Sequence, residues 1–219
     1  LKGITSTRYC DYARIHQLQQ RRLGPSRIMQ TQIAVIDYGS QYSQLIVRRI
    51  RELGYFSRLY RPDELTAIGS PAGVILSGGP RSVTDTDAPD VDFDFLVGLK
   101  VPVLGICYGM QLMAHLLGGQ VEPAPEREFG LAHLSVHGTS RLFEGFSEGD
   151  GEQAVWMSHD DRVLRLPEGF AAVGQSGNSP SAAMASSDDR MFGVQFHPEV
   201  VHTPRGGVVL RNFVLNICG

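Results

Sequence analysis

Cys107 stands in a segment whose residue types could support nucleophilic chemistry. In Gly105-Ile106-Cys107-Tyr108-Gly109, a glycine lies two residues before and two residues after the cysteine. This pattern is typical of a strand that turns abruptly into a helix, with the central residue in a strained conformation at the turn. The positive end of the helix dipole would favour the thiolate, which is the nucleophilic form. A buried structural cysteine is the alternative, and this segment alone does not decide between the two.

A base for such a nucleophile is supplied by His197-Pro198-Glu199. In an extended segment, residues i and i+2 project to the same side, and Pro198 fixes the backbone between them. Glu199 would set the tautomer of His197 and stabilise its imidazolium form, while the other ring nitrogen faces the thiol. A lone histidine at a strand end is more often structural. The neighbouring acid and the glycine-flanked cysteine together favour a catalytic triad.

A third element, Ser77-Gly78-Gly79-Pro80, places a glycine pair at the end of an apolar run. Together with the N–H of Tyr108, an N–H of this loop would stabilise a developing oxyanion. A phosphate-binding loop is excluded, because no lysine follows, Pro80 lacks a donor, and no G-x-x-x-x-G-K-[ST] segment occurs in the chain. A simple tight turn remains the other interpretation.

The elements that must position these residues predict an α/β fold. Strands are expected at Ile33–Ile36, Gly73–Ser77, Val101–Ile106 and Phe192–Phe196, and helices at Gln41–Leu53, Cys107–Leu117 and Gly207–Ile217. Buried strands that alternate with helices indicate three layers, with a mostly parallel central sheet flanked by helices. The aspartate-rich segment 85–94 is expected to be a solvated loop or a helix start, since it lacks the central glycine and terminal glutamate of a calcium loop.

The composition is that of a soluble globular protein with one sizeable core. The chain has 219 residues, of which 42% are hydrophobic and 20% charged, with a formal net charge of −3. This balance does not favour nucleic acid or an anionic membrane as a partner, and no apolar run approaches the length that crosses a bilayer. Cys10, Cys107 and Cys218 are too widely spaced for a disulfide framework or a C-x-x-C metal site, and no histidine cluster has ligand spacing. A reducing compartment, the cytoplasm, is therefore expected.

Residues 1–28 differ from the rest, because they hold six basic residues and a single acidic one. They lack the apolar core of a secretory signal, although arginine-rich, acid-poor segments also serve as organelle transit peptides. We favour a disordered extension or a misassigned start, since Met29 precedes Gln30-Thr31-Gln32 and then the first expected strand, and the chain begins with Leu1. The folded domain is expected to span residues 29–219.

Six motifs give the chain a specific family resemblance. They are D-Y-G-S-Q-Y at 37–42, S-G-G-P at 77–80, G-I-C-Y-G-M-Q at 105–111, R-E-F-G at 127–130, V-W-M-S-H at 155–159 and Q-F-H-P-E-V-V-H-T at 195–203. In this order, from about residue 33 to 218, they resemble the class I (triad) glutamine amidotransferases, and in particular the glutaminase domains of GMP synthases. The resemblance implies a flavodoxin-like sheet with a nucleophile elbow.

The resemblance also implies roles for individual residues. Cys107 would attack the side-chain amide of L-glutamine, His197 would protonate the departing ammonia and then activate water, and Glu199 would orient His197. The N–H groups of Gly79 and Tyr108 would hold the oxyanion. Further substrate contacts are implied for Gln111, Ser158 and His159.

The implied partner is a synthetase domain or subunit, the ATP pyrophosphatase of GMP synthase, which uses ATP and Mg²⁺ to convert xanthosine monophosphate (XMP) to GMP. Its S-G-G-V-D-S loop has no match here, so we expect a fragment of a fused enzyme or the small subunit of a two-chain enzyme, with any oligomer formed through that partner. No cofactor or metal is expected in this domain itself. Asp160 stands where the family usually has glycine, which affects the local turn and the contact with the synthetase.

Three other functions remain open. One is a class I glutaminase that serves another synthetase, such as that of anthranilate or CTP synthesis, although Tyr108, Met110 and His202-Thr203 argue against it. Another is a regulatory module that keeps the fold without turnover. The third is a hydrolase with the same elbow and a different substrate.

Overall fold

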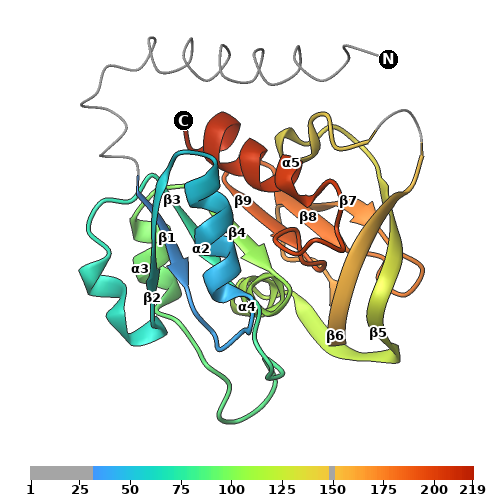
Figure 1. Cartoon of the computed structure of the whole chain (residues 1–219). Helices are drawn as coiled ribbons and strands as arrows, with labels where there is room; N and C mark the ends of the chain where they lie inside the picture. The colour runs from blue at the N-terminus through green and yellow to red at the C-terminus, as the bar shows by residue number, and fades with distance from the viewer. Residues whose placement is uncertain (1–31, 148–150) are drawn as a thin grey trace, which may run out of the picture.

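The computed structural model describes residues 32–147 and 151–219, which form a sheet covered by helices (Figure 1). Its strands are β1 (Gln32–Ile36), β2 (Phe56–Tyr60), β3 (Gly73–Leu76), β4 (Val103–Ile106), β5 (Gln120–Val136), β6 (Gln153–Arg165), β7 (Phe170–Gln175), β8 (Ala183–Ser186) and β9 (Met191–Val194). Its α-helices are α2 (Ser43–Glu52), α3 (Phe93–Gly98), α4 (Tyr108–Leu116) and α5 (Gly206–Arg211). Two 3₁₀ turns, η1 (Pro62–Ala67) and η2 (Arg141–Phe143), and a π-helical turn, η3 (Asn212–Ile217), complete the elements. The predictions for residues 1–28 lie outside the described residues.

The strands form one sheet in the order β2-β1-β3-β4-β9-β8-β7-β5-β6. The first five are parallel, in the 2-1-3-4-5 order of a flavodoxin-like sheet. The remaining four extend the sheet with antiparallel pairs, which end in the long β5–β6 hairpin. The predicted mostly parallel core is confirmed, and the antiparallel extension is an addition that the sequence patterns did not predict.

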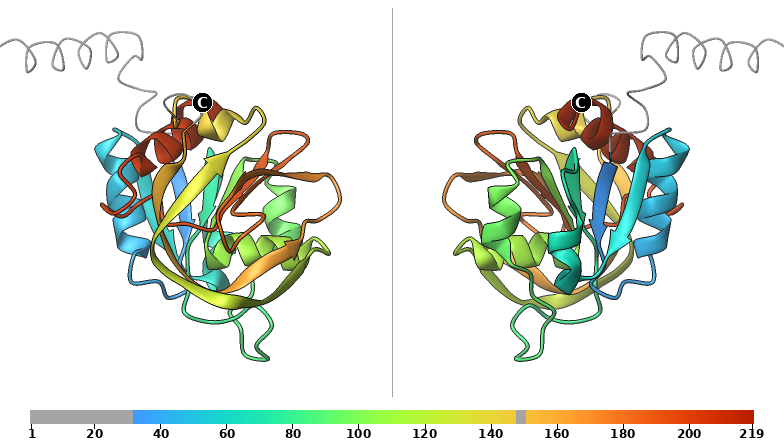
Figure 2. Two further views of the ribbon diagram at one scale, coloured as in Figure 1. Left: turned by 90° about the vertical axis from the view of Figure 1, so that its right-hand side faces the viewer. Right: turned by 90° about the vertical axis from the view of Figure 1, so that its left-hand side faces the viewer.

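Two hydrophobic cores lie on opposite faces of the parallel strands, because successive residues of a strand point to opposite sides. One core packs Ile33, Val35 and Leu104 against Ile46 and Ile50 of α2, Val209 of α5 and Phe213 of η3. The other packs Ala34, Ile36 and Leu76 against Leu96 of α3 and Met110 and Met113 of α4. The two side views show these helix layers on either side of the sheet (Figure 2), which confirms the three-layer prediction.

The predicted local elements agree with the structure to within a few residues. The aspartate-rich segment 85–94 is a loop that leads into a helix start at Asp92, whose carboxylate caps α3 by accepting a hydrogen bond from the N–H of Phe95 at 2.9 Å. The predicted closing helix is present as α5 followed by the η3 turn. Among the described residues, no helix combines the length and apolar character that a bilayer crossing requires.

Candidate active site

Cys107 occupies a strained turn between β4 and α4. Its backbone has φ 51° and ψ −107°, and its side chain is buried. A Cβ at Gly105 would lie 2.6 Å from the carbonyl oxygen of Gly109, and a Cβ at Gly109 would lie 2.3 Å from the carbonyl oxygen of Leu76. Both distances are too short for a side chain, so the elbow requires both glycines. The N–H of Cys107 donates to the carbonyl of Val194 at 2.8 Å, and this bond fixes the turn against the end of β9.

His197 and Glu199 lie just after β9, the strand that pairs with β4, and are therefore brought to the elbow. The Nδ1 atom of His197 is 2.8 Å from Oε1 of Glu199, and both side chains are almost fully buried. The backbone of this segment is held at both residues: the N–H of His197 donates to the carbonyl of Trp156 at 2.9 Å, and Nε of Arg49 donates to the carbonyl of Glu199 at 3.1 Å.

The electrostatics of the triad favour a charged imidazole. Burial alone would lower the pKa of His197, but its hydrogen bonds to Cys107 and Glu199 and their charges raise that pKa well above its ordinary value. His197 therefore carries a proton near neutral pH, between a sulfur and a carboxylate. This arrangement is that of a cysteine–imidazolium pair, with the positive ring beside the sulfur.

The pair predicts a pH signature that is independent of any substrate. Because the proton of His197 places a positive charge beside the sulfur, the alkylation rate of Cys107 by iodoacetamide is expected to follow the protonation of His197 in the wild type. In His197→Asn that dependence is lost, and the rate at pH 7 is expected to be about tenfold below the wild type. Mass-spectrometric counting of alkylated Cys107 measures both rates, and parallel pH profiles for the two proteins would contradict the pair.

The glycine loop after β3 lies against the elbow. A Cβ at Gly78 would be 3.0 Å from Cε1 of His197 and 3.7 Å from Cβ of Cys107, and a Cβ at Gly79 would be 2.9 Å from the carbonyl oxygen of Tyr38. No turn, loop or cap hydrogen bond within the described ranges engages the backbone N–H of Gly79 or of Tyr108. Tyr108 begins α4, where backbone donors have no intrahelical partner. Neither N–H group has an acceptor among these bonds, which is the condition that the predicted oxyanion role requires.

A second group of contacts reaches the thiol from β6 and from Gln195. The Sγ atom of Cys107 is 3.5 Å from the carbonyl oxygen of Ser158 and 3.7 Å from Nε2 of Gln195. The side chain of Gln111 donates to the carbonyl of Asp161 at 2.8 Å and to Oε1 of Gln195 at 3.2 Å. Of the predicted substrate contacts, Gln111 and Ser158 therefore lie in the shell around the thiol.

His159 is placed differently from the other predicted substrate contacts. Its Nδ1 lies 2.9 Å from the carbonyl oxygen of Asp161, and its Nε2 lies 3.2 Å from Oε2 of Glu128. Each ring nitrogen therefore lies close to a protein oxygen. A substrate contact from His159 stays a prediction, and this geometry favours the backbone over the ring for it.

Asp160 lies within β6, at the position where the family motif usually has glycine. The residues with positive φ in the described chain do not include Asp160, so no glycine-specific conformation is needed there. Its carboxylate pairs with Nε of Arg127 at 2.9 Å on the exposed side of the β5–β6 hairpin. The expected disturbance of the local turn is therefore not found.

Sequence reasoning assigned no role to Gln195, Thr203 or Tyr42, which also build the site. The hydroxyl of Thr203 donates to the carbonyl of His197 at 2.7 Å and accepts from the N–H of Trp156 at 3.0 Å, so it joins β6 to the triad. The ring of Tyr42 lies edge-on to His197, with centroids 5.2 Å apart. All three belong to the family motifs quoted above, and this membership was the one feature of the sequence that could have indicated their place in the site.

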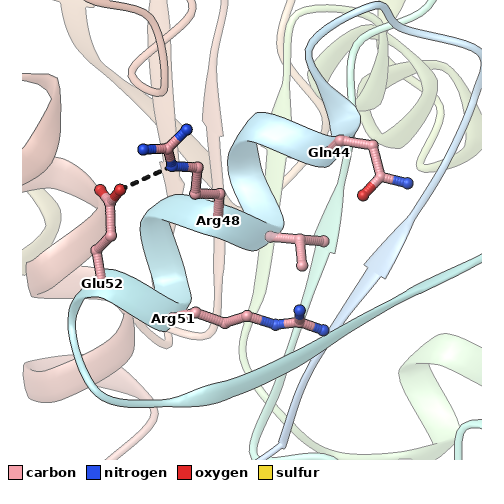
Figure 3. Close-up of a pocket in the computed structure, with 5 residues that line it drawn as sticks. Gln44, Arg48, Arg51 and Glu52 are labelled. Carbon is pink, nitrogen blue, oxygen red and sulfur yellow. Dashed lines mark hydrogen bonds and ion pairs between the residues drawn. The ribbon is translucent and has the colours of Figure 1, made fainter.

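Surface hollows border α2 on two sides. One, of about 370 Å³, lies along the outer side of α2 (Figure 3), where Gln44, Arg48, Arg51 and Glu52 project outward and Arg48 pairs with Glu52 at 2.9 Å. The other, of about 390 Å³, lies between α2 and the segment after Glu199, and its lining includes Tyr42, Val201 and His202. Only the second adjoins the triad. Within residues 32–147 and 151–219, no group of three or more His, Cys, Asp or Glu is arranged to hold a metal ion.

Comparisons with known proteins match most of the chain. The family model "Glutamine amidotransferase class-I" matches residues 34–217. A GMP synthase [glutamine-hydrolyzing] of Lactococcus lactis subsp. lactis is 54% identical over 191 residues, which are 85% of this chain and 36% of that protein. One from Thermosipho africanus is 52% identical over 188 residues, 84% of this chain and 36% of that protein. The chain thus spans little more than a third of these curated relatives.

A solved structure of similar length also matches. It is a Thermoplasma acidophilum protein that is provisionally described as one of the subunits of a GMP synthase, with a TM-score of 0.72 and 32% sequence identity. The match covers 86% of this chain and 94% of that chain. A match at this identity and coverage supports homology as well as a shared fold.

Proposed function

Because the chain belongs to the class I glutamine amidotransferase family, we propose that it hydrolyses L-glutamine to glutamate and ammonia through Cys107, His197 and Glu199. The observation that carries this proposal is that the buried His197 interacts with both Cys107 and Glu199, which are also buried. His197 is bonded to Glu199 through Nδ1 at 2.8 Å, and its pKa is raised by both Glu199 and the thiol at the elbow.

In the first half of the reaction, the Cys107 thiolate attacks the carbon of the side-chain amide, and the carbonyl π electrons move to its oxygen. The free N–H groups of Gly79 and Tyr108 would stabilise that oxyanion. As the tetrahedral intermediate collapses, the C–N bond breaks and the His197 imidazolium gives its proton to the leaving nitrogen. Ammonia departs, and a γ-glutamyl thioester remains on Cys107.

In the second half, neutral His197 takes a proton from water while the water oxygen attacks the thioester carbon. Collapse of the second intermediate breaks the C–S bond, so glutamate leaves and the thiolate–imidazolium pair is restored. Glu199 stabilises the imidazolium that is present before acylation and formed again here. All protons are accounted for by water, His197 and the leaving amine.

The test measures glutamate formation from glutamine by this chain, with and without a GMP synthase ATP pyrophosphatase domain, ATP, Mg²⁺ and XMP. Stimulation by the full mixture, with GMP formed, is expected. Glutamate formation at the same rate with and without the mixture would indicate a glutaminase whose ammonia goes to another acceptor. No activity in either condition would favour the regulatory module.

The oxyanion site can be tested at Gly79. A Cβ there would press on the carbonyl oxygen of Tyr38, so Gly79→Ala is expected to displace the N–H and lower kcat about 10²-fold. Gly98→Ala is the matched control, because a Cβ at Gly98 meets nothing within 4 Å and the residue ends α3. Steady-state glutaminase assays compare the two variants, and equal rates would argue against the oxyanion role of the loop.

We further propose that the ammonia serves a synthetase partner that converts XMP to GMP with ATP and Mg²⁺. The GMP synthase relatives carry almost two thirds of their length outside the matched region, which leaves room for such a domain. No ATP site is proposed within this chain. The free catalytic thiol also suits a reducing compartment, which supports a cytoplasmic location.

The outer face of the β5–β6 hairpin is the surface that we propose for docking of this synthetase. Phe129 and Leu131 are 61% and 64% exposed on β5, and Leu131 lies opposite Trp156 on β6. Trp156 packs on His202, with ring centroids 4.5 Å apart, beside Val201, which is 72% exposed. This apolar face is continuous with the segments that carry Ser158 and Glu199, so a partner seated on it would cover the site.

A charged residue on this face should weaken the stimulation of glutaminase activity by the synthetase. Leu131→Asp is expected to reduce stimulation by the synthetase at least about tenfold, because it desolvates a carboxylate in the interface, while partner-free turnover stays unchanged. Leu164→Asp is the control, since Leu164 is also exposed on β6 but lies toward the other end of the strand. Titration of glutaminase activity with the synthetase measures both variants. Equal stimulation of the two would place the interface elsewhere.

A further inference from the structure

A second histidine–carboxylate pair, the partly buried Glu128 with the buried His159, lies beside the thiol and outside the triad. Glu128 faces His159 directly across the β5–β6 ladder, and the two side chains are 11% and 2% exposed. The carboxylate of Glu128 also accepts hydrogen bonds from the hydroxyl groups of Ser176 at 3.2 Å and Ser179 at 3.3 Å. A buried charge with this many partners is a built site rather than a surface ion pair.

Both ring nitrogens of His159 face oxygen acceptors. Nε2 faces the Glu128 carboxylate at 3.2 Å, and Nδ1 faces the carbonyl of Asp161 at 2.9 Å. A carbonyl oxygen only accepts, so Nδ1 is the ring nitrogen that donates to Asp161, while Nε2 lies within ion-pair distance of the carboxylate. Burial alone would raise the pKa of Glu128, but the hydrogen bond and charge of His159, with the two serine hydroxyls, lower it.

The pair connects to the thiol through the backbone on either side of His159. The carbonyl of Ser158, one residue before, lies 3.5 Å from Sγ of Cys107. The carbonyl of Asp161, two residues after, binds both Nδ1 of His159 and the side chain of Gln111. His159 thus sits between the two carbonyl groups through which β6 reaches the thiol and Gln111.

We infer that Glu128 and His159 form a positioning pair, which fixes the Ser158 and Asp161 carbonyl groups and thereby the glutamine-binding side of the site. This inference rests on the proposed glutaminase function. Neither residue of the pair contacts the sulfur, so the expected effect is on glutamine binding rather than on the nucleophile. Loss of the pair should raise KM for glutamine and leave kcat nearly unchanged.

The test compares Glu128→Gln with Glu122→Gln, under whichever condition of the glutaminase assay gives the higher wild-type rate. Glu122 is a matched control, because it also pairs across the hairpin, with Arg162 at 3.0 Å, but that pair has no contact with Gln111 or Cys107. Glu128→Gln is expected to raise KM about tenfold with kcat within about threefold, whereas Glu122→Gln leaves both near wild type.

Two further variants separate positioning from folding. Ser176→Ala removes one hydrogen bond from Glu128 and is expected to raise KM about threefold in a protein whose thermal unfolding is close to wild type. In the double variant Glu128→Gln with His159→Gln, KM should rise no further than in the worse single variant, because the two residues act as a unit. The half-protecting glutamine concentration against iodoacetamide alkylation of Cys107 should follow the same order.

The possible outcomes distinguish the inference from the proposed function. An unchanged KM in Glu128→Gln, a change equal to that of Glu122→Gln, or additive effects in the double variant would overturn the positioning role while the glutaminase proposal stands. A wild-type chain that neither turns over glutamine nor is protected by it would overturn the proposed function, and this role with it.

Discussion

Replacing Cys107 with alanine is expected to abolish glutamine hydrolysis, with a loss of at least about 10⁴-fold in kcat. The thiolate forms the covalent bond of the acyl intermediate, and neither the oxyanion donors nor His197 can replace it. The fold should persist, since alanine is smaller than cysteine and the elbow conformation depends on Gly105 and Gly109. Glutamate release and circular dichroism of the same preparation measure both expectations.

Cys218→Ala provides the matched control for this variant. Cys218 is the other free cysteine of the described chain, and burial raises the pKa of its thiol to about 12. It is therefore uncharged at neutral pH and should contribute nothing to turnover. Residual activity in Cys107→Ala comparable with wild type, or equal losses in the two variants, would contradict Cys107 as the nucleophile.

The second large effect is expected for Glu199→Gln, with a loss of about 10³-fold in kcat. Glutamine keeps the shape of the side chain and can still accept from Nδ1 of His197, but it removes the buried charge. Because Glu199 is one of the groups that raise the pKa of His197, the pKa of His197 falls in this variant. His197 therefore loses its proton at lower pH than in the wild type, and this is the proton that the leaving nitrogen takes up.

The pH profile distinguishes this charge effect from loss of structure. In Glu199→Gln, the descending limb of kcat, which reports loss of the His197 proton, should move to lower pH. Glu168→Gln serves as the control, since Glu168 is exposed in the turn before β7. A lower kcat with an unmoved pH profile would indicate that Glu199 only supports the local structure.

Local sequence determined the parts of the site that depend on neighbouring residues. The glycines at 105 and 109 dictate a turn that admits no side chain at either position, and the i, i+2 spacing of His197 and Glu199 places their side chains together. The apolar runs likewise predicted β1, β3, β4 and β9, because strands buried on both faces are continuously hydrophobic. These features need only short-range sterics and burial.

The antiparallel half of the sheet could not be predicted in this way. β5 contains Pro123 and Pro125, which normally argue against a strand interior, and its alternation is weak. The strand forms because it pairs with β6 along most of its length, with a register irregularity between Pro123 and Glu128. Such pairing joins residues that lie from 19 (Leu134 with Gln153) to 45 (Gln120 with Arg165) positions apart in sequence, where local propensity carries little information.

The tertiary structure alone decided which groups surround the thiol. Ser158, Gln195 and the Gly78 loop come from three distant segments, and only strand order and register bring them to Cys107. The same register sets Glu128 opposite His159, so that both ring nitrogens of this predicted substrate contact lie close to protein oxygens. The reactive residue types follow from local sequence because their geometry is short-range, whereas their partners depend on long-range strand pairing.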